Sequence, residues 1–263
     1  MKRDCLLAVG WLAALSAAAV LAPFLLTNKS GAVDFSHLLE APSRFHWFGT
    51  DALGRDLFAR ILVATSISLT VAWVAVILSV FLGVVIGAVA GYFGGGWDRS
   101  LMAFVNIMLC FPVFFLILSV IAVLGPNIFN VMVIIGATSW MGTARLVRAE
   151  VLSLKEREFV LAARALGASH ARIIFRHLVP NAMGPVIVNA VLGLAAAVLV
   201  ESGLSFLGIG VQPPTPSWGN LLSDGKGVLG VAWWLTFFPG VMIFLTILSA
   251  NTLGEALQSK NDS

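Results

Sequence analysis

Histidines and carboxylates are the side chains in this sequence that could hold a metal ion or transfer a proton. His37 and His46 share one polar stretch, residues 29–60, with several acidic residues. Transition metals accept such imidazole and carboxylate ligands, but two histidines are too few to define a site. We therefore predict a solvated loop without metal. His170 and His177 stand among arginines, whose charge disfavours a cation between them.

Motifs of known catalytic centres are absent from the sequence. It contains no GxxxxGK(S/T) loop for nucleotide phosphates, no HExxH or CxxC metal motif and no GxSxG nucleophile motif. We therefore expect no catalytic residue and no cofactor in this chain, and we do not expect an enzyme. Cys5 and Cys110 both lie in apolar stretches, which indicates neither a disulfide nor a metal site.

The composition is typical of a membrane protein. Hydrophobic residues make up 59% of the 263 positions and charged residues only 11%, whereas soluble domains carry about 25% charged residues. Long apolar stretches alternate with short charged segments. We therefore predict a single all-α domain, residues 1–263, that lies in lipid and has no role in binding nucleic acid.

Six stretches are long and apolar enough to cross a bilayer core, which takes about 20 helical residues. The first could be a signal peptide, but its uncharged run from Cys5 to Asn28 exceeds the roughly 7–15 residues of a signal's apolar region. Residues 100–144 are uncharged and too long for one span, so the chain must turn back at residues 125–127. The predicted spans are residues 5–27, 66–91, 101–124, 128–148, 183–203 and 231–254.

Small and polar residues inside these stretches predict how the helices pack. Gly83, Gly87 and Gly91 recur every four residues, a spacing that lets two helices approach closely in lipid. Pro112 is expected to kink the third span. Asn106, in the same span, is expected to hydrogen-bond to another helix.

Basic residues are distributed unequally over the two sides that six spans define. With both termini in the cytoplasm, the inner segments carry eleven of the sixteen Lys and Arg residues and the outer segments carry five. Cytoplasmic segments of membrane proteins are enriched in basic residues. We therefore expect both termini and residues 149–181 inside, and residues 27–61 outside.

The segment 157–181 is charged, in a chain that is otherwise mostly apolar. Phe159, Ala162, Ala163 and Leu166 repeat at the spacing of one helix face. A turn and a second helix should follow, because the next residues are of types that end, begin and stop helices. Gly167 suits positive φ at a helix end, Ser169 can cap a new helix, and Pro180 should stop it.

The second helix of this segment should also be amphipathic. Its expected apolar face consists of Ala171, Ile174, Phe175 and Leu178, with basic residues on the other faces. Two short helices with apolar faces and basic flanks, held between membrane spans, suit docking to a cytoplasmic partner.

The same segment resembles the EAA loop of bacterial ABC-importer permeases, whose pattern is E-A-A, three residues, Gly, nine residues, I-x-L-P. Ala162, Ala163, Gly167 and Pro180 fall on this pattern. Leu161, His177 and Val179 stand where that pattern has Glu, Ile and Leu. These departures fit the peptide and nickel branch, which reads close to AARALGAS followed by H-x-x-P-N. Two further stretches look like that branch's other signatures: HWFGTDALGRDLFARI, residues 46–61, and LSFLGIGVQPPTPSWGNLL, residues 204–222.

This resemblance implies a six-span permease subunit of a type I ABC importer in a bacterial inner membrane. A second, related permease would complete the path, two cytoplasmic ATPase subunits would bind ATP and magnesium, and an outer binding protein would deliver the substrate. Di- or oligopeptides are the expected cargo, with nickel or a metal chelate as the alternative. By the same resemblance, the ATPase-coupling residues are Glu158, Leu161, Ala162, Ala163, Gly167 and Pro180.

Two other classes of protein have to be weighed against this one. Secondary transporters usually carry ionisable residues inside their spans, and the middles of these six spans have none. A membrane assembly protein without a transport role is the third class, which a cavity along a path would oppose. Glu201 lies at the outer end of the fifth predicted span. We expect it, with Asp51 and Arg55, to act at an outer gate or in contact with the binding protein.

Overall fold

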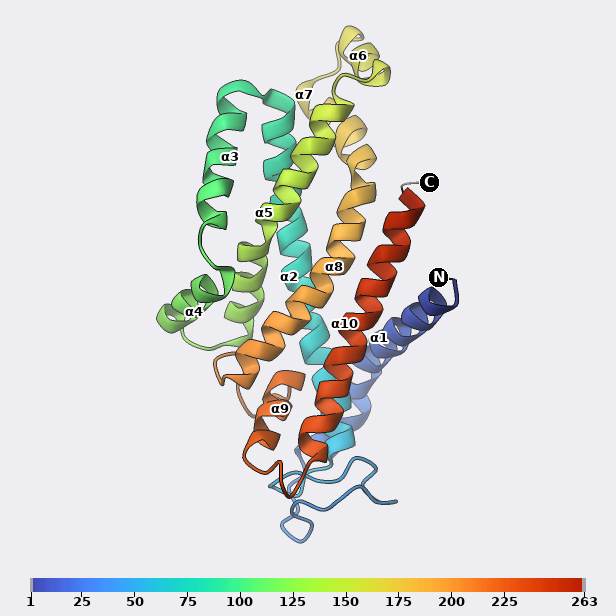
Figure 1. The fold of residues 1–263 in the computed structure, drawn as a ribbon, viewed down its shortest axis with the longest axis vertical. Helices are drawn as coiled ribbons and strands as arrows, with labels where there is room; N and C mark the ends of the chain where they lie inside the picture. The colour runs from blue at the N-terminus through green and yellow to red at the C-terminus, as the bar shows by residue number, and fades with distance from the viewer. Residues whose placement is uncertain (1, 262–263) are drawn as a thin grey trace.

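Five long helices run roughly along the long axis of the molecule (Figure 1). The computed structural model describes the backbone of residues 2–261 and the side chains of residues 4–259. No strand is present in this described part of the chain, which confirms the all-α prediction. The long helices are α1 (Lys2–Gly31), α2 (Leu57–Phe93), α5 (Ile128–Leu154), α8 (Val179–Phe206) and α10 (Trp234–Asn261).

Shorter elements connect and cover the long ones. Two of them, α3 (Gly95–Leu109) and α4 (Val113–Leu124), stand beside α5. At one end of the molecule lie α6 (Glu158–Ala165), α7 (His170–Arg172) and a π-helical turn, Ile173–Leu178. Toward the other end, the loop of residues 32–56 lies near α9 (Trp218–Lys226), a helix that the sequence pattern did not predict.

Within the described residues, four helices are long and apolar enough to cross a membrane. They are Asp4–Gly31, Leu57–Phe93, His170–Phe206 and Trp234–Ser259. The first three contain the first, second and fifth predicted spans and extend beyond them at both ends. The fourth helix begins three residues after the predicted start of the sixth span, residue 231, and ends beyond its predicted end, residue 254.

The third predicted span is not one helix. The chain turns by 84° between α3 and α4, so the expected kink is in fact a break. Pro112 is the N-cap of α4 and follows directly on Phe111, where α-helical structure has already ended. Proline disfavours helical geometry in the residue before it, which explains the position of the break. With α3 and α4 counted as one bent span the total is five, so six spans are not confirmed.

The helix α5 contains the fourth predicted span, but it is not among the four helices that are long and apolar enough to cross a membrane. Small and polar residues lie in its middle, and Arg145 and Arg148 follow toward its end. This helix nevertheless packs along most of α2, and Trp140, Ala144 and Val147 are buried in the contact region.

Close packing between α2 and α5 depends on the predicted glycine row. A Cβ atom built on Gly87 would lie 2.4 Å from the carbonyl oxygen of Ala144, a distance that real Cβ atoms do not show. Gly83 and Gly91 meet α5 in the same way, at Thr143 and Arg148. The prediction that this row permits a close helix pair is confirmed, because only a residue without a side chain fits there.

Candidate translocation path and coupling element

The helix–turn–helix predicted for residues 157–181 begins as expected. Gly167 has φ +77° and follows the last turn of α6. Two hydrogen bonds close that end: Gly167 N–H donates to the Arg164 carbonyl over 3.0 Å, and Ala168 N–H donates to the Ala163 carbonyl over 3.1 Å. This pair of bonds is the Schellman arrangement, which favours glycine at the left-handed position. Ser169 then caps α7 by accepting a hydrogen bond from Arg172 N–H.

Pro180 does not stop the second helix, so that prediction was wrong. It lies in the first turn of α8, and helical structure continues without a break from His170 to Phe206. A proline inside a helix removes one N–H and crowds the carbonyl four residues earlier. The wide π-helical turn at Ile173–Leu178 relieves this crowding, since Val179 N–H donates to the Ile174 carbonyl five residues back.

The π-helical turn also changes which face of the second helix is buried. Ile174 and Leu178 are buried as predicted, but Ile173 is buried as well, whereas Ala171 and Phe175 are exposed. The buried residues pack with Val160 of α6 against the ends of α2 and α5, at Ala88, Tyr92, Val147 and Val151. The whole element, residues 158–178, is therefore packed onto the ends of α2 and α5.

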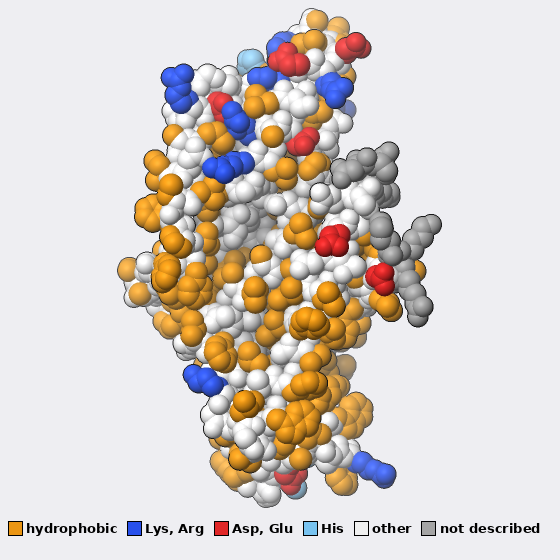
Figure 2. All heavy atoms as spheres, in the orientation of Figure 1, with side chains coloured by type: hydrophobic (Ala, Val, Ile, Leu, Met, Phe, Trp, Pro, Cys, Tyr) orange, Lys and Arg blue, Asp and Glu red, His pale blue; other side chains and the backbone are white. Residues whose placement is uncertain are grey.

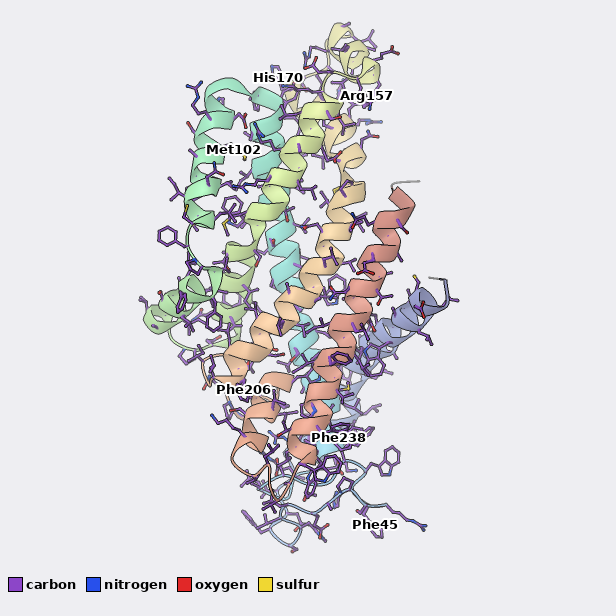
Figure 3. All side chains as sticks on the ribbon, in the orientation of Figure 1. Phe45, Met102, Arg157, His170, Phe206 and Phe238 are labelled. Atoms are coloured by element: carbon purple, nitrogen blue, oxygen red, sulfur yellow. The ribbon has the colours of Figure 1, made fainter. Side chains whose placement is uncertain are left out.

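The outer face of this candidate coupling element exposes apolar side chains. Leu166 is 88% exposed, and Phe159, Leu161 and Phe175 are exposed too. Figure 2 shows charged side chains around the same tip, and Figure 3 shows Arg157 and His170 on either side of it. Glu158 and Ala162 are exposed on α6, and Ala163 is half-buried. Exposed apolar residues with charged neighbours are typical of a surface that contacts another protein.

A cavity of about 310 Å³ lies between α2, α5 and α8. Figure 2 shows a hollow in the middle of the molecular surface that faces the viewer. Its polar lining consists of Ser79, Ser139, Thr143 and Asn189, and Asn189 Nδ2 donates to Thr143 Oγ1 over 2.9 Å. Among the residues that the structure describes, no charged side chain lines this cavity. It therefore offers hydroxyl and amide groups to a solute, within walls that are otherwise apolar.

Glu201 is fully buried, one residue beyond Val200, which lines the cavity. Its carboxylate accepts hydrogen bonds from Ser205 (2.7 Å) and from Ser68 of α2 (3.0 Å). Trp218 N–H donates to Ser68 Oγ over 3.2 Å. Glu201 therefore joins α2, α8 and the start of α9 at the loop end of the cavity. Its burial leaves no surface for direct contact with a binding protein.

Asp51 is also internal, at 2% exposure. Of its two expected roles, in an outer gate or in contact with the binding protein, the buried carboxylate has no surface for the second. It accepts a hydrogen bond from Arg55 Nε over 2.7 Å and pairs with the buried Arg60. Arg60 reaches Asp224 of α9 over 3.2 Å. Ion pairs among these four charged side chains connect the loop to α2 through Arg60 and to α9 through Asp224. No short sequence pattern pairs Arg60 with Asp224, because their contact spans more than 160 residues of chain.

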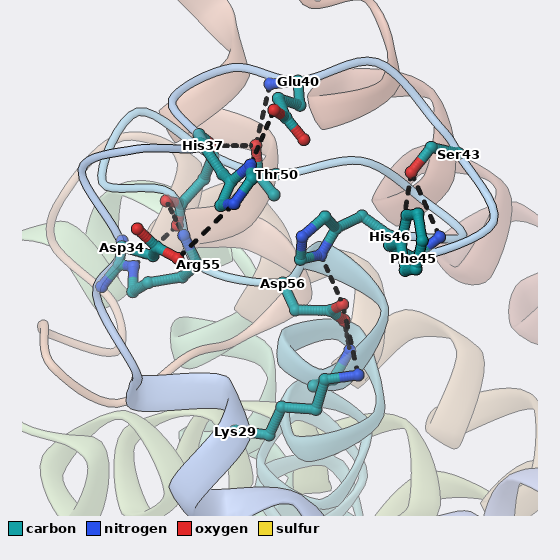
Figure 4. Close-up of polar contacts among 12 residues, drawn as sticks. Lys29, Asp34, His37, Glu40, Ser43, Phe45, His46, Thr50, Arg55 and Asp56 are labelled. Atoms are coloured by element: carbon teal, nitrogen blue, oxygen red, sulfur yellow. Dashed lines mark hydrogen bonds and ion pairs between the residues drawn. The ribbon is translucent and has the colours of Figure 1, made fainter.

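The loop of residues 32–56 has a second polar cluster around its two histidines (Figure 4). His46 Nδ1 lies 3.0 Å from Asp56, and His37 Nδ1 lies 2.7 Å from Glu40. Burial alone would raise the pKa of Asp56, but Ala59 N–H, His46 and Lys29 together lower it below its ordinary value. The hydrogen bond with Glu40 raises the pKa of His37.

Residues 83–262 match the profile of a family described as the binding-protein-dependent transport system inner membrane component. The chain belongs to this family. It is 39% identical to the dipeptide transport system permease protein DppC of Alkalihalophilus pseudofirmus (strain ATCC BAA-2126 / JCM 17055 / OF4), over 93% of this chain and 80% of that one. It is 40% identical to the glutathione transport system permease protein GsiD of Escherichia coli O6:K15:H31 (strain 536 / UPEC), over 87% of this chain and 76% of that one.

A solved structure supports the same fold. An inward-facing conformation of the MetNI methionine ABC transporter matches with a TM-score of 0.54 and 17% identity, over 76% of this chain and 97% of that one. This likeness concerns the fold alone. Together with the family, it confirms the recognition made from the sequence: the protein is an integral inner-membrane permease subunit of an ABC importer, a component for transport.

Proposed function

We propose that this permease carries di- or oligopeptides, and that the cavity between α2, α5 and α8 is its half of the path. The cavity is the observation on which this proposal rests most. Its hydroxyl and amide groups can exchange hydrogen bonds with peptide groups, and its lining has no charge that would select one side chain over another. The two relatives named above are permeases for dipeptides and glutathione, which supports the same class of cargo.

The importer would need four further subunits around this chain. A second permease of the same family would close the path on its open side, and two ATPase subunits would each receive one coupling element. A binding protein would deliver the substrate from outside. The chain itself would hold no cofactor, since ATP and magnesium would bind to the ATPases.

The coupling residues follow from the packing of the tip. Leu161, Ala162 and Ala163 lie on α6, whose outer face is exposed, and Glu158 lies in its first turn, where a negative charge favours the helix dipole. Gly167 permits the tight turn after α6. Pro180 requires the wide π-helical turn that precedes it in the chain. We propose that these residues position α6 and α7 against an ATPase and that the unit moves with α2 and α5.

The topology is part of the same proposal. The chain would be one domain over residues 1–263, with the two polar ends of its bundle on opposite sides of the membrane. In Figure 1 the start of α1 and the end of α10 both lie away from the loop of residues 32–56. Such an arrangement supports cytoplasmic termini on the side of the coupling element, with the loop outside, as the distribution of basic residues predicts.

A deletion strain tests the cargo. We expect a strain without this chain to lose growth on di- and tripeptides as the only source of a required amino acid, while its nickel-dependent enzyme activity stays normal. The chain supplied from a plasmid should restore growth on peptides. Normal use of peptides with a loss of nickel-dependent activity would instead support nickel or a nickel chelate as the cargo.

A further inference from the structure

The loop of residues 32–56 brings two histidines and a glutamate together. One ligand atom each from His37, Glu40 and His46 lies within 4.8 Å of the others, and the two imidazole rings are 5.7 Å apart. Glu40 comes from a part of the loop that turns back beside both rings (Figure 4). The sequence shows two histidines, but only the folded loop adds the third ligand.

Thr50 holds the backbone of this cluster in place. Its buried hydroxyl donates to the His37 carbonyl over 2.6 Å and accepts from Glu40 N–H over 2.8 Å. Thr50 N–H in turn donates to the Glu40 carbonyl over 3.0 Å. The positions of His37 and Glu40 are thus fixed by one buried residue, so their approach does not depend on the two side chains alone.

Asp56 orients the second imidazole. Its Oδ2 lies 3.0 Å from His46 Nδ1, and its Oδ1 caps α2 by accepting a hydrogen bond from Ala59 N–H over 2.9 Å. An ionised carboxylate only accepts hydrogen bonds, so Nδ1 of His46 carries the proton and Nε2 keeps a free lone pair. A carboxylate behind a ligating histidine is the usual second layer of a metal site. Asp56 is 5% exposed and is held in this position as the cap of a long helix.

We propose that His37, Glu40 and His46 bind a divalent first-row transition metal ion, of which Zn²⁺ is the suitable probe. Two imidazoles and a carboxylate are ligands that such ions accept, and water would complete the coordination. The ion would be resident in the loop and not cargo, because the cavity proposed as the path is lined by α2, α5 and α8 and includes none of these residues. The bound ion would cross-link residues 37–40 to His46, in the part of the loop that leads into α2.

Negative charge around the two rings favours a cation. Asp34 lies 3.8 Å from His37 Nε2, so three carboxylates, those of Asp34, Glu40 and Asp56, surround the two imidazoles. Lys29 pairs with Asp56 over 3.4 Å and offsets part of this charge. A bound Zn²⁺ would replace the contact between His37 and Glu40 by two bonds to the metal.

Zn²⁺ titration of the purified full chain tests this site. The chain would carry an affinity tag without histidine, be freed of metal in detergent and be titrated by calorimetry. We expect one Zn²⁺ per chain, and binding at this stoichiometry should disappear in His46→Ala and in His37→Ala. His177→Ala is the matched control, since it removes a histidine from the opposite end of the molecule, and it should bind as the wild type does.

A second variant tests the orientation of His46 separately from folding. In Asp56→Asn the amide oxygen can still cap α2, but the amide N–H₂ faces the imidazole and favours protonation at Nε2, which blocks that nitrogen as a ligand. We expect the affinity for Zn²⁺ to fall by about 10–100-fold while the melting temperature without metal stays near that of the wild type. Undiminished binding in Asp56→Asn, or equal binding in the wild type and a His37→Ala/His46→Ala double variant, would overturn the proposal.

Discussion

The hydroxyl of Tyr92 lies 2.7 Å from Nδ1 of His170, and this contact joins the last turn of α2 to the first residue of α7. The two rings also meet edge to face, with centroids 5.6 Å apart. Tyr92 is the single tyrosine of the chain. Since α2 lines the cavity and α7 belongs to the coupling element, this pair is a direct link between them.

Replacing Tyr92 by phenylalanine should weaken that link while leaving the ring in place. A neutral hydrogen bond contributes about 0.5–1.5 kcal/mol, so we expect uptake by Tyr92→Phe to fall roughly two- to tenfold. The ATPase should still co-purify with the permease, because the exposed face of α6 is unchanged. Substrate uptake into vesicles and ATPase content measure the two effects.

The double variant Tyr92→Phe/His170→Ala shows whether the two residues act through each other. If the hydrogen bond is what matters, its uptake should be no lower than that of His170→Ala alone. Effects that simply add would show that Tyr92 and His170 act independently and would contradict the proposed link.

Ala163→Arg tests the docking of α6. Arginine has nearly the helix propensity of alanine, so α6 should persist, but a large charged side chain would hold two packed surfaces apart. We expect this variant to lose uptake and ATPase co-purification at a normal level of permease in the membrane. Full uptake by Ala163→Arg would rule out docking by this face.

Gly87→Ala tests the close contact of α2 and α5. The added methyl would lie 2.4 Å from the Ala144 carbonyl, and overpacking of this kind costs about 1–3 kcal/mol. We expect a lower melting temperature in detergent. Gly142→Ala makes the same chemical change in α5 where nothing lies within 4 Å, so it should be neutral or slightly stabilising. Equal melting temperatures for the two variants would contradict the packing argument.

Cysteine labelling tests the cavity. In a chain whose own Cys5 and Cys110 are replaced, Ser139→Cys should react with a water-soluble thiol reagent in the assembled transporter, and a transported peptide should slow the reaction. Ser139 lines the cavity, whereas Ser249 is buried in α10 and is not part of its lining. Ser249→Cys should therefore react slowly, with or without peptide. A rate at Ser139→Cys that peptide does not change would argue against this cavity as the path.

Labelling from outside intact cells tests the topology. Phe45, in the loop of residues 32–56, is 87% exposed, and Ser169 is exposed in the coupling element. An impermeant reagent should label Phe45→Cys in intact cells and Ser169→Cys only after the cells are opened. Labelling of Ser169→Cys in intact cells would reverse the proposed orientation.

Local sequence determined the features of this protein that neighbouring residues can specify. The apolar stretches predicted all five long helices, since burial of backbone groups in lipid requires helix over such lengths. Gly167 and Ser169 marked the end of one helix and the start of the next because their types match local backbone geometry. The row from Gly83 to Gly91 indicated a close helix contact, although it did not say that α5 is the partner.

Tertiary structure decided the features that depend on residues distant in the chain. The predicted stop at Pro180 failed because the π-helical turn at Ile173–Leu178 accommodates the proline without ending the helix. Asp51 was expected at an outer gate or in contact with a binding protein, but the fold buries its carboxylate against Arg55 and Arg60. Glu40 joins His37 and His46 only because Thr50 folds the loop back. Sequence reasoning predicts local backbone preference and apolar burial well, whereas the partner of a polar side chain is set by contacts that no short pattern contains.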